Sequence, residues 1–276
     1  MAVQVASLNS GSNGNCYYVG NNEEAVLIDA GIPCREIERR MDQIGLDIQA
    51  LKAIFVSHEH TDHVKGLAKI SNKYNLPVFI TEKTAARGPY LIKHLSQPFY
   101  AEQEISIGNL TVTAFSKKHD ADDPHSFIIS CNGVTVGVIT DIGTACDQVV
   151  KYFGQCHAVF LESNYDDEML MNGRYPFFLK NRISSDVGHL SNKQALDLFI
   201  NHRPDFMTHV FLSHLSKDNN TPETALSLFA PHAENVEVLV ASRYEASKVY
   251  TITGTNYMPA PRLKMNSYVQ LAMFDK

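Results

Sequence analysis

The sequence is short of paired cysteines. It has five, an odd number, and no two of them form a CxxC pair. They are scattered along the chain: Cys16, Cys34, Cys131, Cys146 and Cys156. A disulfide framework or a zinc ribbon needs cysteines at short, regular spacings, so both are excluded. Isolated thiols are typical of a reducing compartment, and the cytoplasm is the predicted location.

Long hydrophobic runs and a strong charge of one sign are also missing. No window approaches the roughly 18 apolar residues of a membrane span, and the first five residues carry no basic signal segment. We therefore expect no membrane association. The net charge of −6 gives no global preference for nucleic acid, but it leaves a local basic face open. With 276 residues, 44% of them hydrophobic, the chain can bury a large core.

What the chain does have is a regular series of short strands and helices. Three apolar runs near the N-terminus predict a β-meander, and the Asn132-Gly133 turn predicts a hairpin. The later strands alternate with helices, which predicts an α/β fold in which helices sandwich the sheets. The predicted strands are 3–8, 16–19, 25–28, 52–56, 78–80, 105–107, 110–115, 127–130, 134–140, 158–161, 210–212 and 236–240. The predicted helices are 35–44, 63–74, a helix capped by Thr81, 148–153, 192–201 and 222–229, with 166–182 irregular but helical.

The most informative stretch is residues 58–63, which read His-Glu-His-Thr-Asp-His directly after an apolar strand. Imidazole ligates zinc and related transition metals, and carboxylate ligates, bridges or orients a water. If the strand ends at Ser57, then His58 and His60 project to one side as a chelating pair. Asp62 and His63 then begin a helix and reach a second ion. The alternative is a solvated polar turn that is rich in histidine.

Acids and imidazoles also follow four other predicted strands. His119, Asp141, Glu162 and His214 each come just after an apolar run. Such positions lie at the rim of a sheet, where sites form in layered α/β proteins. Any one of them could be a surface polar group, but four together with the histidine motif predict one shared site. Five other histidines lack this placement and are interpreted as surface or packing residues: His94, His157, His202, His209 and His232.

The chain resembles the metallo-β-lactamase fold superfamily over nearly all of residues 1–254. The resemblance rests on Leu27-Ile28-Asp29-Ala30-Gly31, the HxHxDH motif at 58–63, His119, Asp141, Glu162, His189 and His214. Within the superfamily it is similar to the bacterial YycJ/WalJ-type phosphodiesterases. That similarity rests on Ser10-Gly11-Ser12-Asn13-Gly14-Asn15, His119-Asp120-Ala121, Glu162-Ser163-Asn164, Gly188-His189-Leu190-Ser191-Asn192 and Leu212-Ser213-His214-Leu215-Ser216. It implies an αββα four-layer sandwich, formed by residues 1–254 as one catalytic domain, and metal-dependent nuclease activity.

The resemblance also implies a role for each matching side chain. Two divalent ions, zinc or manganese, would share seven ligands: His58, His60 and His119 on the first, Asp62, His63 and His214 on the second, and Asp141 as a bridge. Asp62 would also orient the attacking water. Glu162 and His189 would form a carboxylate-oriented imidazole that donates a proton to the leaving oxygen. Asp29 would support the HxHxDH loop through hydrogen bonds.

The spacing between the motifs limits the substrate. Only 26 residues separate Glu162 from His189, and only 21 separate His119 from Asp141. These gaps are too short for the inserted domain of the RNA-cleaving relatives or the arm of the tRNA-processing relatives, so we expect an open site. The loop 10–15 is a candidate phosphate cradle through its backbone N–H groups. Residues 174–182 combine three cations with three aromatics, which predicts either a nucleic-acid surface or an amphipathic packing helix.

These features predict a dinuclear-metal phosphodiesterase, and more specifically an exonuclease acting on DNA in repair. An RNA-processing nuclease is one alternative. A small-molecule hydrolase of the same fold, acting on a thioester, lactone or lactam, is another, although the Glu162/His189 pair and Ser213-His214 favour a phosphodiester. A binding or regulatory protein with structural metals is a third. Seven potential ligands disfavour it, because structural sites usually close at four.

The end of the chain, residues 255–276, carries a separate motif. Beyond Pro259-Ala260-Pro261, the sequence Gln270-Leu271-Ala272-Met273-Phe274 resembles the peptide by which bacterial replication and repair proteins dock on the sliding clamp. Leu271, Met273 and Phe274 would enter an apolar groove while Gln270 hydrogen-bonds at its edge. This interpretation favours DNA over RNA as the substrate. The alternative is a last strand or arm that packs on the body of the protein or on a second subunit.

Overall fold

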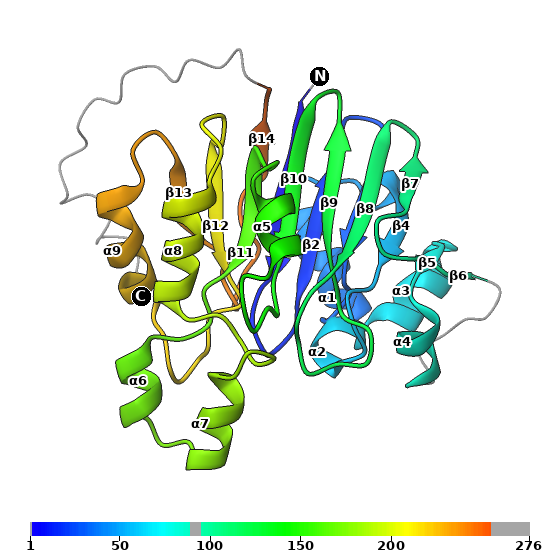
Figure 1. The fold of residues 1–276 in the computed structure, drawn as a ribbon. Helices are drawn as coiled ribbons and strands as arrows, with labels where there is room; N and C mark the ends of the chain where they lie inside the picture. The colour runs from blue at the N-terminus through cyan, green and yellow to red at the C-terminus, as the bar shows by residue number, and fades with distance from the viewer. Residues whose placement is uncertain (1, 89–94, 255–276) are drawn as a thin grey trace.

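Two seven-stranded sheets lie face to face, with helices on both outer faces, in the computed structural model, which describes residues 2–88 and 95–254 (Figure 1). The first sheet, in spatial order, contains β14 (Tyr250–Ile252), β1 (Val3–Asn9), β2 (Cys16–Gly20), β3 (Ala25–Ile28), β4 (Leu51–Phe55), β5 (Val78–Phe79) and β6 (Ser96–Gln97). The second contains β13 (Glu237–Val240), β12 (His209–Ser213), β11 (Ala158–Glu162), β10 (Val134–Ile139), β9 (His125–Cys131), β8 (Leu110–Ser116) and β7 (Glu104–Ile107).

Each sheet is antiparallel on one side and parallel on the other. In the first sheet, β14, β1, β2 and β3 pair antiparallel, whereas β3, β4, β5 and β6 pair parallel. In the second, β7 to β10 pair antiparallel and β10 to β13 pair parallel. The predicted N-terminal meander and the later βαβ units are thereby confirmed.

The helices form the two outer layers. They are α1 (Cys34–Gln43), α2 (Thr61–Val64), α3 (Leu67–Tyr74), α4 (Glu82–Ala86), α5 (Asp147–Phe153), α6 (Asp167–Asn172), α7 (Phe177–Ile183), α8 (Asn192–His202) and α9 (Pro222–Phe229), with short 3₁₀ turns at Ile48–Ala50 and Ala230–His232. Buried residues of α1 and α3 pack on the first sheet, and those of α5, α8 and α9 pack on the second. None of the helices in the described ranges is long and apolar enough to cross a membrane.

The main core lies between the two sheets. The Tyr17 and Phe160 rings contact each other across it with centroids 4.9 Å apart, and Phe55 and Phe127 do so at 5.7 Å. Both pairs join a strand of one sheet to a strand of the other, so the residues that face inward on each strand hold the sandwich together. The predicted four-layer αββα sandwich is confirmed.

The structure corrects the sequence-based elements in two places. The predicted helix 63–74 is two helices, α2 and α3, because Gly66 breaks it. The Gly66 N–H donates to the Ala30 carbonyl at 2.8 Å, and a Cβ there would lie 2.1 Å from the Ile32 carbonyl oxygen. The sequence also did not predict β6 or β14, both of which are three residues or shorter. Residues 166–182, expected to be irregular but helical, form α6 and α7.

Two of the sequence-based predictions lie outside the described residues. His94 is one. The other is the segment 255–276 with its proposed clamp-docking residues Gln270, Leu271, Met273 and Phe274.

Candidate metal centre

Six strand ends meet at one edge of the sandwich. β3 and β4 are parallel, as are β10, β11 and β12, so the carboxyl ends within each group emerge at a shared edge. β8 is antiparallel to β9, and β9 to β10, so β8 ends at the same edge as β10. All the side chains predicted as ligands or catalytic groups belong to four overlapping groups whose ligand atoms lie within 4.8 Å of one another: His58, His60, Asp62, His63, His119, Asp141, Glu162, His189 and His214.

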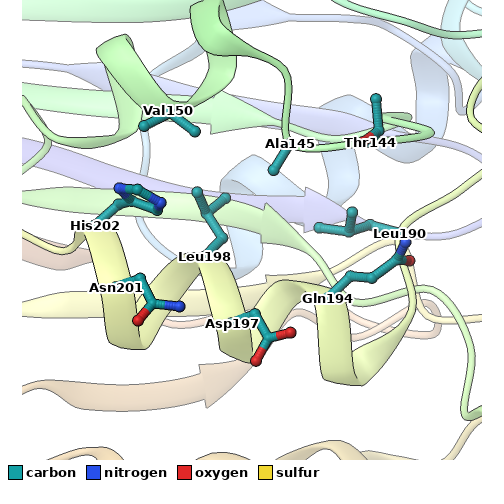
Figure 2. A pocket seen from close by; sticks show the side chains of 9 residues that line it. All are labelled: Thr144, Ala145, Val150, Leu190, Gln194, Asp197, Leu198, Asn201 and His202. Carbon is teal, nitrogen blue, oxygen red and sulfur yellow. The ribbon is translucent and has the colours of Figure 1, made fainter.

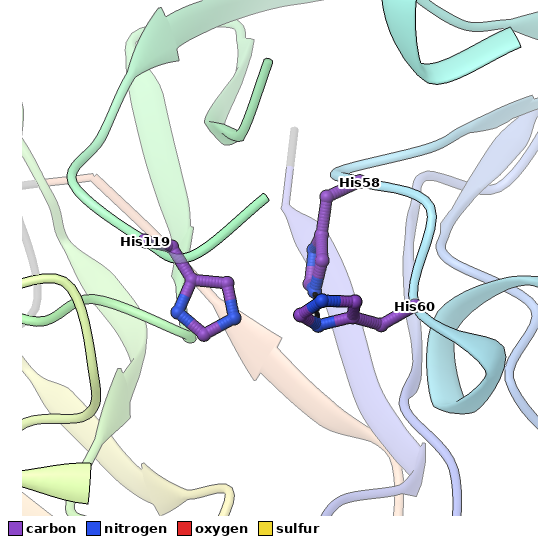
Figure 3. A group of neighbouring side chains, drawn as sticks. All are labelled: His58, His60 and His119. Atoms are coloured by element: carbon purple, nitrogen blue, oxygen red, sulfur yellow. Dashed lines mark hydrogen bonds between the residues drawn. The ribbon is translucent and has the colours of Figure 1, made fainter. Parts of the chain in front are cut away.

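The first cluster consists of three imidazoles, His58, His60 and His119. Their rings face one another from two loops, one following β4 and one following β8 (Figure 3). His58 Nε2 lies 3.0 Å from His60 Nδ1. His119 Nδ1 lies 3.0 Å from the Gly188 carbonyl oxygen and must donate to it, so the lone pair of the neutral ring is on Nε2. His119 therefore presents Nε2 as a ligand atom toward the other two rings.

The second cluster consists of Asp62, His63 and His214. His63 Nδ1 is fixed by Asp29 Oδ2 at 2.7 Å, which leaves His63 Nε2 beside Asp62 Oδ2 at 3.6 Å. His214 Nδ1 is fixed by Glu162 Oε1 at 3.0 Å, and its Nε2 lies 3.7 Å from Asp62 Oδ2. In both histidines a carboxylate holds one ring nitrogen and thereby turns the other toward Asp62.

Asp141 lies between the two clusters. Its Oδ2 is 3.4 Å from His63 Nε2, and its Oδ1 is 3.3 Å from His214 Nδ1 and 4.0 Å from His119 Nε2. The side chain is 2% exposed, so these imidazoles and not water surround it. A single carboxylate within reach of ligands from both clusters has the geometry of a bridging group.

Glu162 and His189 form a hydrogen-bonded pair beside the clusters. His189 Nδ1 donates to Glu162 Oε1 at 2.8 Å, while Glu162 Oε2 accepts from the Ile142 N–H at 2.6 Å. Glu162 is fully buried, but the His189 side chain is 21% exposed. Because Glu162 holds Nδ1, the second nitrogen of this partly exposed ring is left for a reacting group.

Three of the strand-end residues adopt a left-handed backbone conformation. Asp29, Asp141 and His214 have φ angles of 61°, 54° and 57°. This region is uncommon for residues other than glycine, and such strain costs on the order of 1–3 kcal/mol per residue and collects at functional sites. Asp29 and His214 follow β3 and β12 directly, and Asp141 follows β10 after one residue, so the turn that ends each strand also directs the side chain toward the site.

The two clusters differ in their protonation. Burial lowers the pKa of His58 well below its usual range and that of His119 to about 4. Burial also acts to lower the pKa of His63 and His214, but neighbouring carboxylates, Asp141 foremost, reverse this. They raise the pKa of His63 well above its usual range and that of His214 to about 10. In the metal-free protein, the raised pKa values of His63 and His214 therefore favour protons on these two rings, whereas the lowered pKa values of His58 and His119 do not.

Sequence reasoning missed Lys117, which is buried at this site. Its Nζ donates to the Thr140 carbonyl at 2.7 Å and so fastens the residue before Asp141. Burial lowers the pKa of Lys117, although Asp141 and Asp29 act against this change. In the sequence, Ser116-Lys117-Lys118 looks like a solvated charge run. The available signal was proximity in the sequence, because Lys117 lies two residues before His119.

The loop 10–15 supports the site in a different way from the one predicted. The N–H groups of Ser10, Gly11, Gly14 and Asn15 are already bonded, to Ser242, Asn15, Gly11 and Asp62 respectively, so they do not form an open phosphate cradle. The side chains act instead. Ser10 Oγ accepts from the His214 N–H at 2.7 Å, and Asn15 Nδ2 lies 3.1 Å from His63 Nε2. The cradle prediction therefore fails for these four amides, because they bond within the fold.

The remaining sequence-based assignments are also located. Asp29 accepts from the N–H and the hydroxyl of Ser57, both at 2.8 Å, as expected for support of the histidine loop. His157 precedes β11 and His209 begins β12, so both lie at the opposite edge of the sheet from Glu162 and His214. His125, to which the sequence pattern assigned no role, is buried at the start of β9 against the Phe99 ring.

A separate pocket of about 210 Å³ lies between α5 and α8 (Figure 2). It is lined by Thr144, Ala145, Val150, Leu190, Gln194, Asp197, Leu198, Asn201 and His202. Ligand sites are usually about 300–1,000 Å³, so this pocket is small for a substrate. It meets the candidate metal centre only through Leu190, the neighbour of His189, and we assign it no role.

The chain is similar to known proteins over most of its length. The family model described as the metallo-β-lactamase superfamily matches residues 10–171. The chain is 38% identical over 229 residues to the exodeoxyribonuclease YycJ of Bacillus anthracis, covering 82% of this chain and 87% of that protein. It is 31% identical over 224 residues to the exodeoxyribonuclease WalJ of Streptococcus pneumoniae, covering 79% and 83%.

Solved structures agree on the fold. The metallo-β-lactamase fold protein YhfI from Bacillus subtilis superposes with a TM-score of 0.68 at 15% identity, covering 91% of this chain and all of that one. The short form of human tRNase Z superposes with a TM-score of 0.62 at 13% identity, covering 89% and 98%. The predicted resemblance is confirmed, and the chain belongs to the metallo-β-lactamase superfamily of metal-dependent hydrolases.

Proposed function

We propose that the protein is a dinuclear-metal exonuclease that acts on DNA. The observation that carries this proposal is the Glu162–His189 pair, 2.8 Å apart, directly beside the seven proposed ligands. A phosphodiester needs a proton at its leaving oxygen, and an imidazole held by a buried carboxylate can supply one. The relatives named exodeoxyribonucleases, which match about four-fifths of this chain, support DNA as the substrate.

The donor set fits two divalent ions. Nε2 of His119, Oδ2 of Asp141 and Nε2 of His214 are buried and have no hydrogen-bond partner among the described residues. A buried polar atom without a partner is costly and calls for an explanation, which a bound cation gives. Under this proposal His58, His60 and His119 would hold the first ion, Asp62, His63 and His214 would hold the second, and Asp141 would serve both. Imidazole and carboxylate suit both zinc and manganese.

The chemistry follows from what these residues hold in place. A pair of bound divalent ions stabilises the attacking and leaving oxygens of an in-line phosphoryl displacement. Asp62, the most exposed of the ligand carboxylates at 24%, orients the attacking water at the open side of the site. His189 gives its proton to the leaving oxygen, and Glu162 holds the ring and stabilises its charged form.

The direct test is an assay of end-labelled single- and double-stranded DNA and RNA, with zinc, manganese or magnesium added to metal-free protein. We expect mononucleotides to be released stepwise from DNA, and the position of the label to report the polarity. Internal cuts as the first products would overturn the exonuclease assignment. RNA cleavage that exceeds DNA cleavage would favour the RNA-processing alternative.

Two alternatives have narrower support. Ribonuclease J 1 of Streptococcus pyogenes is 24% identical over 141 residues, which covers 42% of this chain and 23% of that protein. A small-molecule hydrolase would use the same ligand set but has no need of the Glu162–His189 pair. A thioester assayed in parallel with DNA separates this alternative, because we expect turnover of the phosphodiester only.

A role in DNA repair rests on the C-terminal motif and is part of the proposal, as is the cytoplasmic location, which rests on the isolated cysteines. Residues 270–274 would dock on the sliding clamp, with Phe274 as the apolar anchor. The test is a titration of the full-length protein against labelled clamp, with Phe274→Ala as the matched variant. Absence of binding at high micromolar clamp, or equal binding by the variant, removes this part of the proposal.

A further inference from the structure

The short segment between Glu162 and His189 forms a projection beside the candidate metal centre. It contains α6 and α7, which extend from the body of the molecule at the same end as α2 (Figure 1). The 166–188 region is thus the part of the described chain best placed to meet a long substrate before the substrate reaches His189.

This projection exposes apolar side chains that the rest of the protein buries. None of the residues of α7 is buried; Phe177 is 70% exposed and Phe178 is 74% exposed. Of the seven large hydrophobic residues exposed in the described ranges, four lie between positions 171 and 187: Met171, Phe177, Phe178 and Val187. This exposure disfavours the alternative of an amphipathic packing helix, although Leu179 and Ile183 of α7 are partly buried. Exposed apolar patches of this kind mark interaction surfaces.

The charge of the same segment indicates what it meets. α7 and the turn before it, residues 173–183, carry three cations, Arg174, Lys180 and Arg182, and no carboxylate, whereas the two ends of the projection carry Asp166, Asp167, Glu168 and Asp186. A surface that mates with a second copy of itself would bring these like charges together, which disfavours a dimer interface. Aromatic rings beside cations are instead complementary to the bases and phosphates of a nucleic acid.

The far end of α7 is fastened to the proposed catalytic groups. The His189 N–H donates to the Ile183 carbonyl at 2.8 Å. Gly188 lies so close to the end of α7 that a Cβ there would be 2.2 Å from the carbonyl oxygens of Arg182 and Ile183. Arg182 Nε also donates to Asp120 Oδ2 at 2.5 Å, and Asp120 Oδ1 lies 3.3 Å from His119 Nε2. The helix is a fixed extension of the site.

The helix is also of a suitable length. Phe177 precedes Ile183 by six residues, or about 9 Å at 1.5 Å per residue. That distance corresponds to about three stacked nucleotides at 3.4 Å each. Neighbouring residues on a helix point in different directions, so Phe177 and Phe178 do not cover each other and offer two separate ring faces.

We propose that α7 is a stacking platform for single-stranded nucleic acid, which Phe177 and Phe178 grip by its bases and Arg174 and Lys180 by its phosphates. This inference rests on the proposed nuclease function and adds a strand requirement to it. The faces of bases in an intact duplex are covered by their neighbours and are closed to aromatic side chains. The substrate that reaches His189 is therefore unpaired over its last few nucleotides.

The test uses full-length protein and fluorescence anisotropy with a single-stranded 20-mer and a blunt duplex of the same sequence, in EDTA to prevent cleavage. The wild type binds the single strand more tightly than the duplex. Phe177→Ala/Phe178→Ala lowers single-strand affinity by about tenfold or more, since base stacking on one aromatic side chain already contributes about that much.

Phe→Tyr at both positions keeps the rings and the affinity, whereas Phe→Leu loses both. The matched control is Tyr100→Ala, which removes another exposed ring, 64% exposed, from a different part of the protein.

The outcomes separate the platform from the nuclease proposal. If the wild type cleaves DNA but the double alanine variant binds single strands within twofold of it, the platform is wrong and the nuclease function stands. If the wild type hydrolyses a thioester and neither binds nor cleaves nucleic acid, the proposed function itself fails. Sedimentation velocity tests whether this surface is a subunit interface instead. If the wild type is a dimer and the double alanine variant is a monomer, the surface is a subunit interface and the proposal is overturned.

Discussion

The two ligand clusters of the candidate metal centre use the same side chain, imidazole, in opposite electrostatic surroundings. The first cluster has three imidazoles, and its near carboxylates, Asp120 at 3.3 Å and Asp141 at 4.0 Å, both approach His119 Nε2. Burial lowers the pKa of His58 and His119. The second cluster is surrounded by Asp29, Asp62, Asp141 and Glu162 through contacts of 2.7–3.7 Å, and the pKa values of His63 and His214 rise.

This difference means that the clusters are prepared for cations in different ways. The first presents neutral nitrogens, so an ion that binds there displaces few protons. The second already carries positive charge in the form of protonated imidazoles, balanced by the surrounding carboxylates. An ion that binds there replaces those protons and leaves the local charge balance nearly unchanged. The first cluster should therefore behave as a preformed site and the second as an exchange site.

The largest effect is expected from Asp141→Asn, because Asp141 is the one carboxylate that both clusters share. We expect loss of cleavage by more than about 10³-fold, since metal-ion catalysis contributes several kcal/mol. Metal content, measured by elemental analysis, should fall together with activity. His60→Ala should also abolish cleavage, but with loss of metal mainly from the first cluster. Asp197→Asn, on the exposed face of α8, is the control. Full activity with full metal occupancy in either site variant would show that the two-cluster assignment is wrong.

The next largest effect is expected from His189→Ala, which sharpens the comparison because it leaves every proposed ligand of both clusters in place. Loss of the proton donor should lower kcat by about 10²–10⁴-fold. Both metals should remain bound, because His189 contacts Glu162 and is not a proposed ligand. His202→Ala on α8 serves as the matched histidine control. If elemental analysis finds one metal missing from His189→Ala, then His189 is a ligand and the role of His214 must be reassigned.

The sequence predicted the site better than it predicted the surroundings of the site. The ligand residues follow apolar strands, and parallel pairing carries such strand ends to one edge, so a purely local pattern was enough to group them. Lys117 shows the opposite case. The Lys117 side chain is buried because it packs beside Thr140 and Asp141, which lie 23 or more residues away in the sequence. A local charge pattern does not record contacts between such distant residues.

The strands and the helix break that the sequence did not predict were missed for the same reason, because they too depend on long-range contacts. β14 is three residues long and pairs with β1 across nearly the whole described chain, from Val3 to Ile252. Gly66 breaks the predicted helix because of the approach of the Ala30 and Ile32 carbonyls, a tertiary contact. The loop 10–15 has the composition of a phosphate loop, yet most of its amides are consumed by bonds within the fold. Short elements and loops are decided by long-range contacts, which periodicity does not record.

A smaller effect is expected from Asp29→Asn, which acts on one cluster only. Asp29 fixes His63 Nδ1 at 2.7 Å, and loss of such a partner typically lowers metal affinity by about 10–100-fold. We expect competition with a chelator to remove one ion easily while the other stays bound, and excess metal to restore cleavage. Ser57→Ala is the comparison variant, because the Ser57 hydroxyl contacts both His58 Nδ1, at 2.9 Å, and His63 Nδ1, at 3.2 Å. Equal weakening of both ions by Asp29→Asn would erase the distinction between the clusters.

The smallest and most direct test is the effect of pH on the metal-free protein. The pKa of His214 is raised from 6.5 to about 10 by Asp141, Asp62 and Glu162 against the effect of burial, so this ring is charged at pH 8. A raised pKa in the folded state stabilises the fold fully below pH 6.5, and this contribution is lost as the pH rises through 10. Metal must displace the same proton, so affinity at the second cluster should increase by about tenfold per pH unit for each proton released. The first cluster should show no such slope above pH 7, because the pKa of His119 lies at about 4.

NMR of the imidazole C–H groups at pH 8 should find His63 and His214 protonated and His58 and His119 neutral. Four neutral rings would contradict the exchange site.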